Sequence, residues 1–415
     1  MSGLRTVRDR RTVLLTVLAA LASWSCSERL PNPAIITTGP LVTPDLNPQP
    51  LACQSDSTAD QTRDTLLIDS AGQFPVASSD GSNGTVIAFR GRGAHVDIQG
   101  RIDFAVLDSA AHLVQRISPS ELDSPVDDRN PAFIALNSQE WLLLYAEMTP
   151  GGPGGTFDIS RAVYHIRFSR TTDGGRTWSA PRTPPLPGID TLLASPYGKM
   201  RQLPDGRVLA AIYDSQDSMS NYYSYNARLL VSPDHGQTWL VQSTLPQLHN
   251  ETAFLPVGGD TVVAAMRSGA NWLEITSSPD LGQTWTPAFQ LTELNQVAGD
   301  LAQLPNGELL LVYGSRTSDP KGIQYRLLRR QGLEIFASPE GLVVPVGTSG
   351  IDFGYPSIVK VLPDGVVSLV YYVSGADVPG VTQMRYAVFC PYVVPRVMSW
   401  HNKHASSAQE SKGRP

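Results

Sequence analysis

The chain contains 415 residues, of which 41% are hydrophobic and 17% charged, so it is long enough for one large core or two ordinary domains. Its 35 glycines and 33 prolines are spread between short apolar runs, which favours many strands and turns over a helical fold. The formal net charge of -6, with no basic cluster after the first dozen residues, argues against a nucleic-acid partner.

The first 26 residues have the pattern of an export signal. A basic stretch containing the Arg10-Arg11 pair, which loosely resembles a twin-arginine signal, precedes an apolar run over 13–22 that is too short to span a bilayer. Ser23-Trp24-Ser25-Cys26 resembles a bacterial lipobox, in which Cys26 would carry a lipid; the alternative is ordinary signal-peptidase cleavage. We therefore expect an exported protein, either secreted or held as a periplasmic, outer-membrane or cell-surface lipoprotein.

Two further cysteines lie far apart, at Cys53 and Cys390. In an oxidising compartment they could form a disulfide, and the alternative is two unpaired thiols. Neither has the CxxC or Cys/His spacing of a zinc site, so no structural metal or cofactor is expected.

Polar segments flank the repetitive part of the chain. Residues 27–64 are rich in Pro, Ser, Thr, Asp and Gln without sustained periodicity, which indicates a flexible spacer. The tail at 398–415 is similarly polar and is expected to be disordered. These limits leave one folded domain over 65–397.

Within this domain, three segments fit the pattern S/T-x-D-x-G-x-T-W, known as the Asp box: 171–178, 232–239 and 278–285. The Asp can accept hydrogen bonds from backbone N–H groups in a tight turn, Gly takes a positive φ, and Trp folds back as an apolar plug. The pattern therefore predicts a structural turn and not a catalytic group.

A second repeat interleaves with the first. Pro-Asp-Gly or Pro-Asn-Gly separates two apolar runs at 202–209, 303–310 and 361–368, with weaker copies at 79–81, 136–138 and 257–259, and each predicts a β-hairpin. Six such hairpins, three of them followed by an Asp box, predict an all-β, six-bladed β-propeller with blades near 73–115, 127–180, 196–244, 249–290, 296–345 and 353–395. A β-sandwich is the alternative, although it would not explain two interleaved repeats.

Three Asp boxes on a six-unit β array resemble the sialidase superfamily, also described as BNR-repeat proteins, over roughly residues 73–390. The resemblance implies a Tyr nucleophile assisted by a Glu, an Asp acid/base and three Arg that hold the substrate carboxylate, in place of the usual two-carboxylate scheme. A neutral Tyr suits an anomeric carbon that already bears a carboxylate, because it meets less charge repulsion.

Two segments resemble the family's catalytic strands. Gly354-Tyr355-Pro356-Ser357 makes Tyr355 the candidate nucleophile, with a packing Tyr as the alternative. Glu251 and Arg267 lie on successive predicted strands and are similar to the family's base and carboxylate clamp; an inter-strand ion pair is the alternative.

Residues 89–97 resemble the segment that supplies the family's acid/base. The resemblance makes Asp97 the candidate, with Asp103 as its rival, and Arg90 or Arg92 would line the pocket. A plain surface loop is the alternative.

The remaining arginine positions depart from the family. Gln73 stands in Gln73-Phe74-Pro75 where the family carries Arg-Ile-Pro, and Gln brings neither charge nor a bidentate donor pair. Arg316 and Lys321 are both candidates for the third clamp residue.

Three hypotheses follow from the resemblance and its departures. The first is a retaining exo-α-sialidase-like glycoside hydrolase whose partner is an extracytoplasmic glycan or sialoglycoconjugate. The second is a propeller that binds glycans without chemistry. The third is a glycosidase or lyase acting on another anionic sugar. None requires a cofactor, and any membrane attachment would come from the N-terminal lipid alone.

Overall fold

In a computed structural model, short strands make up nearly all the regular structure of the described residues. The structure describes Cys53 and residues 62–392, except 83, 93–98, 124–125, 222, 247, 318–319, 349 and 376–380, all within the unit Pro48–Pro415. In this part, 3-10 turns form at η2 (Ser120–Leu122) and η3 (Pro153–Gly155), and no helix has the length and apolarity needed to cross a bilayer.

Hydrogen bonds group the strands of the described residues into five sheets. The first contains β2 (Gln73–Ser79), β3 (Thr85–Arg90), β4 (Ile102–Leu107) and β5 (Leu113–Ile117). A seven-stranded sheet contains β6 (Asp127–Ala135), β7 (Trp141–Thr149), β8 (Val163–Thr171), β9 (Ala194–Gln202), β10 (Val208–Asp214), β11 (Asn226–Ser232) and β12 (Leu240–Thr244). Its two antiparallel parts, β6–β8 and β9–β12, are joined by a short parallel pairing of β6 with β9.

The three other sheets follow along the chain. One contains β13 (His249–Pro256), β14 (Val262–Ser268), β15 (Leu273–Ser278) and β16 (Phe289–Gln290). The next contains β17 (Gln296–Gln303), β18 (Leu309–Ser315), β19 (Gly322–Gln331), β20 (Glu334–Ala337) and β21 (Gly341–Pro345). The last combines β22 (Phe353–Val361), β23 (Val367–Ser374) and β24 (Thr382–Phe389) with β1 (Arg63–Ile68), which pairs with β24.

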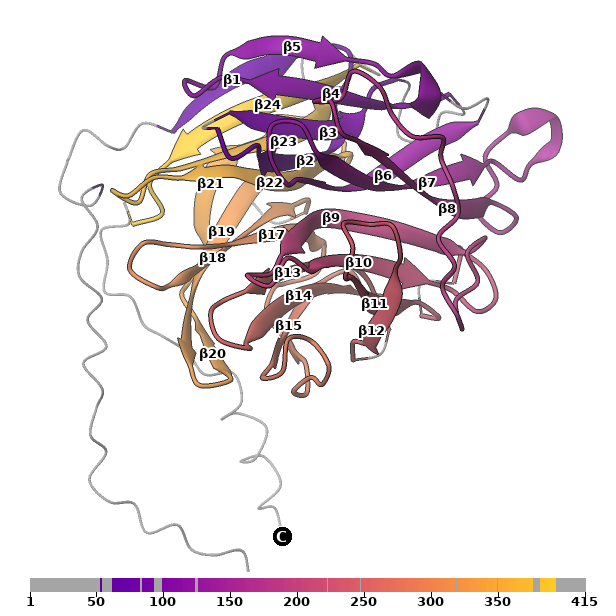
Figure 1. Ribbon diagram of the computed structural model, residues 1–415. Helices are drawn as coiled ribbons and strands as arrows, with labels where there is room; N and C mark the ends of the chain where they lie inside the picture. The colour runs from indigo at the N-terminus through magenta and orange to yellow at the C-terminus, as the bar shows by residue number, and fades with distance from the viewer. Residues whose placement is uncertain are drawn as a thin grey trace, which may run out of the picture. The chain divides into compact units, whose positions relative to one another are not determined.

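The sheets have a propeller-like arrangement (Figure 1). The strands β2, β6, β9, β13, β17 and β22 lie against one another in this order, and β22 lies against β2 again, so they close a circuit. The yellow strands at the end of the chain therefore lie beside the indigo strands at its beginning. The all-β, propeller-like fold predicted from the repeats is what the structure contains.

The predicted turns form as their residues dictate. In each Asp box the carboxylate accepts hydrogen bonds from the backbone N–H and the hydroxyl of the Thr four residues on, at 2.6–3.0 Å. The box glycines have φ of 79–85° at one position, a conformation that glycine adopts without a Cβ penalty. The Trp of each box packs between neighbouring sheets; Trp178, for example, stacks on Phe104 with ring centroids 4.8 Å apart.

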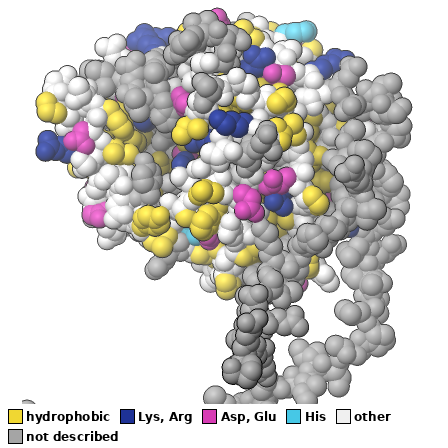
Figure 2. Space-filling model, turned by 180° about the vertical axis from the view of Figure 1, so that it is seen from behind, with side chains coloured by type: hydrophobic (Ala, Val, Ile, Leu, Met, Phe, Trp, Pro, Cys, Tyr) yellow, Lys and Arg dark blue, Asp and Glu magenta, His cyan; other side chains and the backbone are white. Residues whose placement is uncertain are grey.

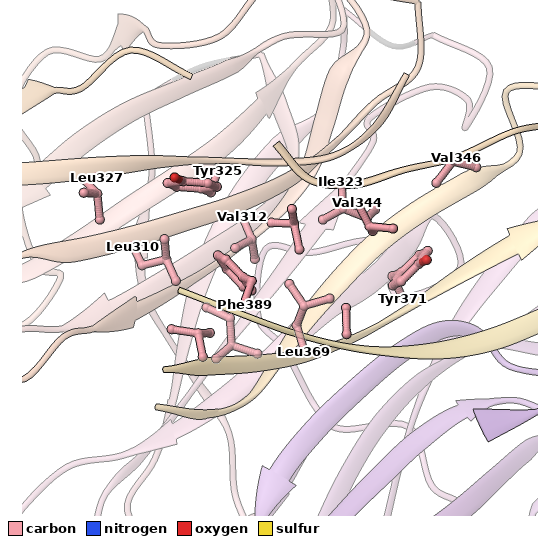
Figure 3. Close-up of a cluster of buried hydrophobic side chains, with 14 of the residues drawn as sticks. Leu310, Val312, Ile323, Tyr325, Leu327, Val344, Val346, Leu369, Tyr371 and Phe389 are labelled. Atoms are coloured by element: carbon pink, nitrogen blue, oxygen red, sulfur yellow. The ribbon is translucent and has the colours of Figure 1, made fainter. Parts of the chain in front are cut away.

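Apolar side chains fill the spaces between adjacent sheets. Figure 3 shows one such cluster, in which side chains of β18, β19 and β21 meet those of β23 and β24. A disulfide joins Cys53 to Cys390 at the edge of this cluster. On the face drawn in Figure 2, acidic and basic side chains are interspersed, in keeping with the small net charge.

Candidate active site

Most strands of the central circuit share an irregularity near their first residues. They break register with a neighbouring strand there, as between Gly354 and Ser357 of β22 and between Gln73 and Val76 of β2, whereas β9 breaks register farther along, after Tyr197. Several residues at these breaks have positive φ, namely Phe74 (54°), Asn130 (51°), Gly198 (71°), Ala298 (62°) and Tyr355 (50°). A bulge re-aims a side chain, and positive φ is strained for a bulky residue, so Tyr355 is held in an unusual orientation.

Tyr355 meets Glu251 and Arg267 at this end of the strands. The Tyr355 hydroxyl donates a hydrogen bond to Oε1 of Glu251 at 2.6 Å, and Nη1 of Arg267 donates to Oε2 of the same carboxylate at 2.7 Å. The same Arg267 nitrogen lies 3.5 Å from the Tyr355 oxygen. Asn271 accepts from the other side of the guanidinium at 2.8 Å, which fixes its plane. The Glu251 carboxylate therefore lies between the hydroxyl proton of Tyr355 and the positive charge of Arg267.

The electrostatics keep this tyrosine protonated at rest. Burial raises the pKa of Tyr355 well above its ordinary value and Glu251 raises it further, while Arg267 and Arg316 oppose the shift. Burial lowers the pKa of Arg267, but the charge of Glu251, the hydrogen bond to it and the nearby tyrosines together outweigh this effect, so the pKa is raised overall. A phenolate can therefore form here only as the proton passes to a base, and Glu251 is the base in contact.

Arg316, the residue directly after β18, also lies close to Tyr355. Its guanidinium lies 5.5 Å from the Tyr355 ring centroid, and its Nε donates to the carbonyl of Phe353 at 3.1 Å. Its buried Nη2 has no hydrogen-bond partner among the described residues. A buried guanidinium nitrogen without an acceptor favours an anionic ligand.

A pocket opens above these groups. Among the described residues, its lining contains Glu251 and three arginines, Arg129, Arg267 and Arg316. The lining also contains aromatic and apolar side chains, those of Phe157, Ile159, Tyr164, Tyr213, Met219 and Tyr225. The pocket thus combines positive charge near Tyr355 with an apolar side, as small-molecule sites often do.

Arg129 is a pocket residue that the sequence analysis did not single out. Its Nε lies 2.7 Å from Oδ2 of Asp127, and its guanidinium lies 5.9 Å from the Phe74 ring centroid. The signal was present, because Arg129-Asn130-Pro131 has the same residue-x-Pro form, with positive φ at the middle residue, as Gln73-Phe74-Pro75.

Gln73 and Arg90 lie outside the pocket lining. Nη1 of the buried Arg90 donates to Gln73 at 2.5 Å, and its Nε donates to Oδ1 of Asp127 at 2.7 Å. Asp127 also pairs with Arg129. Gln73 and Arg90 therefore help to hold Arg129 in position through Asp127.

The other candidates are spread more widely. Arg92 is half-exposed and lies 3.4 Å from Asp123. Lys321 does not line the pocket, and its carbonyl accepts from the N–H of Val346. The buried Asp103 pairs with Arg101 and Arg116 at 2.7 and 2.8 Å, which gives it a structural role. Asp97 and Cys26 lie outside the described residues.

This chain is similar to known proteins in sequence and in structure. Residues 112–365, more than half of the chain, match a family model described as a BNR repeat-like domain. The chain belongs to the BNR repeat-like family. No curated protein matches the sequence.

Solved structures share the fold of this family member. A protein of unknown function from Dyadobacter fermentans is 23% identical, with 79% of this chain and 99% of that one covered and a TM-score of 0.65. A Hadza microbial sialidase is 17% identical over 78% of this chain and 66% of its own, with a TM-score of 0.56. Trypanosoma rangeli sialidase, in complex with the inhibitor DANA, is 13% identical over 78% of this chain and 56% of its own, with a TM-score of 0.57. The chain thus has a sialidase-like fold.

Proposed function

We propose that the protein is a retaining glycoside hydrolase that removes a terminal anionic sugar, with an α-sialoside as the leading substrate, from glycans outside the cytoplasm. The observation that carries this proposal is the 2.6 Å hydrogen bond from Tyr355 to Glu251 beside the guanidinium of Arg267. A nucleophile in contact with a base that a third group orients is the arrangement that covalent catalysis requires.

The chemistry has two steps. In the first, the Tyr355 oxygen forms a bond to the anomeric carbon while its proton passes to Glu251, the glycosidic C–O bond breaks, and the leaving oxygen takes a proton from an acid. In the second, water attacks the same carbon and gives a proton to the conjugate base of that acid, the bond to Tyr355 breaks, and Glu251 returns its proton to the phenolate oxygen. Asp97 stays the predicted acid/base in both steps.

The three arginines would hold the substrate carboxylate. Arg316 has a buried nitrogen without an acceptor among the described residues, and Arg267 and Arg129 line the same pocket. Each guanidinium can donate two hydrogen bonds to one carboxylate, so an anionic sugar gains more here than a neutral one. In this proposal Arg129 takes the place of Gln73, and Arg316, not Lys321, is the third clamp residue.

Two further proposals concern the scaffold and its location. The closed circuit of β2, β6, β9, β13, β17 and β22 supports a count of six blades, with the seven-stranded sheet taken as two. The Cys53–Cys390 disulfide supports export to an oxidising compartment, as the signal-like N-terminus suggests, with lipidation at Cys26 as the means of anchoring.

The test is hydrolysis of a fluorogenic α-sialoside by the wild-type protein and by Tyr355→Phe, with Tyr371→Phe as control. Tyr371 is also a buried tyrosine hydrogen-bonded to a carboxylate, that of Asp64, but it lies outside the pocket. We expect turnover by the wild type and by the control, and none by Tyr355→Phe. If the wild type is inactive but binds the sialoside, the proposal is replaced by glycan binding without catalysis. If it cleaves only uronic-acid glycans, the substrate is another anionic sugar.

A further inference from the structure

A second buried charge pair lies below the candidate site, along the same inner strands. The pocket shares Phe74, Asn130 and Tyr355 with a smaller cavity that Lys199 and Asp300 also line. Lys199 in turn lines a third cavity, formed by residues farther along the inner strands, such as Ser79 of β2 and Val361 of β22. Lys199 therefore lies between the cavity beneath Tyr355 and the other end of the strands.

Lys199 and Asp300 hold one peptide segment between them. Nζ of Lys199 lies 2.7 Å from Oδ2 of Asp300, and both side chains are about nine-tenths buried. Oδ2 of Asp300 also accepts the N–H of Ile358 at 2.8 Å, while Lys199 donates to the carbonyl of the same residue. One ion pair thus satisfies both backbone groups of Ile358.

The location of Ile358 makes this contact relevant to Tyr355. β22 is the edge strand of its sheet, so one side of its backbone has no neighbouring strand to bond with. The register break between Gly354 and Ser357 leaves Tyr355 and Pro356 without ladder partners on β23. The pairing resumes at Ser357, and Ile358 is the next residue, three after Tyr355. An unsatisfied buried N–H or carbonyl at Ile358 would be costly.

We propose that Lys199 and Asp300 are positioning residues that hold the backbone of β22 so that Tyr355 stays directed at Glu251. This inference rests on the proposed function for its catalytic consequence, but the contact itself can be tested without it. A displacement of the nucleophile by about 1 Å can cost about 10²-fold in rate even when the mutated residue lies away from the reacting atoms.

The charge state of Lys199 should make the positioning of Tyr355 depend on pH. Burial lowers the pKa of the Lys199 ammonium to about 8, against the raising effect of Asp300. A neutral amine would leave the buried Asp300 carboxylate with the more distant Arg201, at 3.6 Å, as its cation, so the positioning of Tyr355 should weaken as pH rises through about 8. The other titratable groups lining the cavities around Lys199 are Tyr197, Arg201, Asp300, Tyr355 and Lys360.

The experiment compares full-length wild type with Lys199→Met, Lys199→Arg and Asp300→Asn. The control is Arg228→Met, because Arg228 forms an equally close 2.7 Å pair with Asp214 away from the cavities. Amide hydrogen exchange of the peptide covering 353–361 is measured at neutral pH by mass spectrometry, and kcat and KM for the fluorogenic sialoside are measured from pH 6 to 10.

We expect Lys199→Met and Asp300→Asn to exchange about tenfold faster in 353–361, as the loss of about one hydrogen bond implies, with no change there in Arg228→Met. We expect kcat to fall by about 10- to 100-fold in both, with KM within about threefold, and the alkaline limb of the wild type to disappear in Lys199→Arg, which keeps its charge. Unchanged exchange in Lys199→Met overturns the positioning contact. Faster exchange with no turnover by any protein overturns the proposed hydrolase function while the contact stands.

Discussion

The Asp-box turns and the pocket ends of the inner strands are both repeated, but they repeat differently. In the three Asp boxes the backbone, the side chains and the hydrogen bonds recur, and each turn is satisfied within itself. At the pocket ends the same bulge recurs while the side chain changes from strand to strand, for example Phe74, Asn130, Ala298 and Tyr355. In the Asp boxes, where the side chains repeat, the residues support the fold. At the pocket ends, where only the backbone conformation repeats, the side chains are free to differ and can provide the residues of a site.

The contrast extends to how the charges are paired. Asp173 and Asp280 are half-exposed and bonded to a Thr within their own turn. Glu251, in contrast, is bonded to side chains from two other strands, Tyr355 and Arg267. Changes at the pocket ends should therefore affect activity, and changes at the Asp boxes should affect stability alone.

The largest expected effect is at the proposed base. Glu251→Gln keeps the shape of the side chain but cannot take the Tyr355 proton, so kcat should fall by about 10²- to 10⁴-fold. Glu147→Gln is the matched control, because Glu147 also pairs with an arginine, Arg167 at 3.1 Å, outside the pocket. Steady-state kinetics of the two variants checks this prediction. Equal activities of Glu251→Gln and Glu147→Gln would contradict a specific role for Glu251 in catalysis.

A smaller loss is expected at the proposed carboxylate contact. Arg316→Met removes one charged hydrogen bond to an anionic sugar, so kcat/KM should fall by about 10- to 100-fold. The control is Arg182→Met, since Arg182 also lies over an aromatic ring, Phe168 at 4.9 Å, but bonds to the Asp-box turn at Gly236. An equal loss in both variants would contradict a ligand contact for Arg316.

The disulfide is expected to act on stability without reaching the pocket. Replacing Cys53 and Cys390 by Ser together should lower the free energy of unfolding by about 2–4 kcal/mol, measured by denaturant titration. The kcat of the folded variant should stay unchanged, because neither cysteine lines the pocket. A large loss of kcat at full occupancy of the folded state would show that the two regions are coupled.

The smallest effect is expected at the Asp boxes. The hydrogen bonds from Thr284 lower the pKa of Asp280 to about 2. The stabilisation by this carboxylate is therefore present above its unfolded pKa near 4 and is lost as pH falls toward 2. Asp280→Ala should lower the Tm by a few degrees at pH 7 and by almost nothing near pH 2, with kcat unchanged. Thermal unfolding across pH checks this, with Asp205→Ala, in an exposed hairpin turn, as the comparison.

Repetition explains why the fold was accessible from the sequence. Pro-Asp-Gly turns and Asp boxes are local, so the residues that form them are adjacent in the chain, and the sequence patterns predict hairpins directly. The spacing of the hairpins then predicted a propeller-like array. The pairing of β6 with β9 and of β1 with β24 joins segments through tertiary contacts that no local pattern encodes.

The candidate site was only partly accessible. The proposed roles of Tyr355, Glu251, Arg267 and Arg316 came from a resemblance, and the structure brings these residues to one pocket. Arg129 was not predicted, because the resemblance places the corresponding clamp residue at Gln73, in the same residue-x-Pro form earlier in the chain. Arg90 and Asp127 form a buried ion pair across two sheets, and the sequence separation of such partners gives no signal of contact.

The most direct test of the central claim is to trap the covalent intermediate on Tyr355. The protein is incubated with a 3-fluorosialosyl fluoride, whose fluorine beside the anomeric carbon slows the second step, and is then digested and analysed by mass spectrometry. The proposed mechanism predicts one added sugar on the peptide containing Tyr355 and none in Tyr355→Phe. An adduct on another residue, or turnover of the α-sialoside by Tyr355→Phe at the wild-type rate, would contradict it.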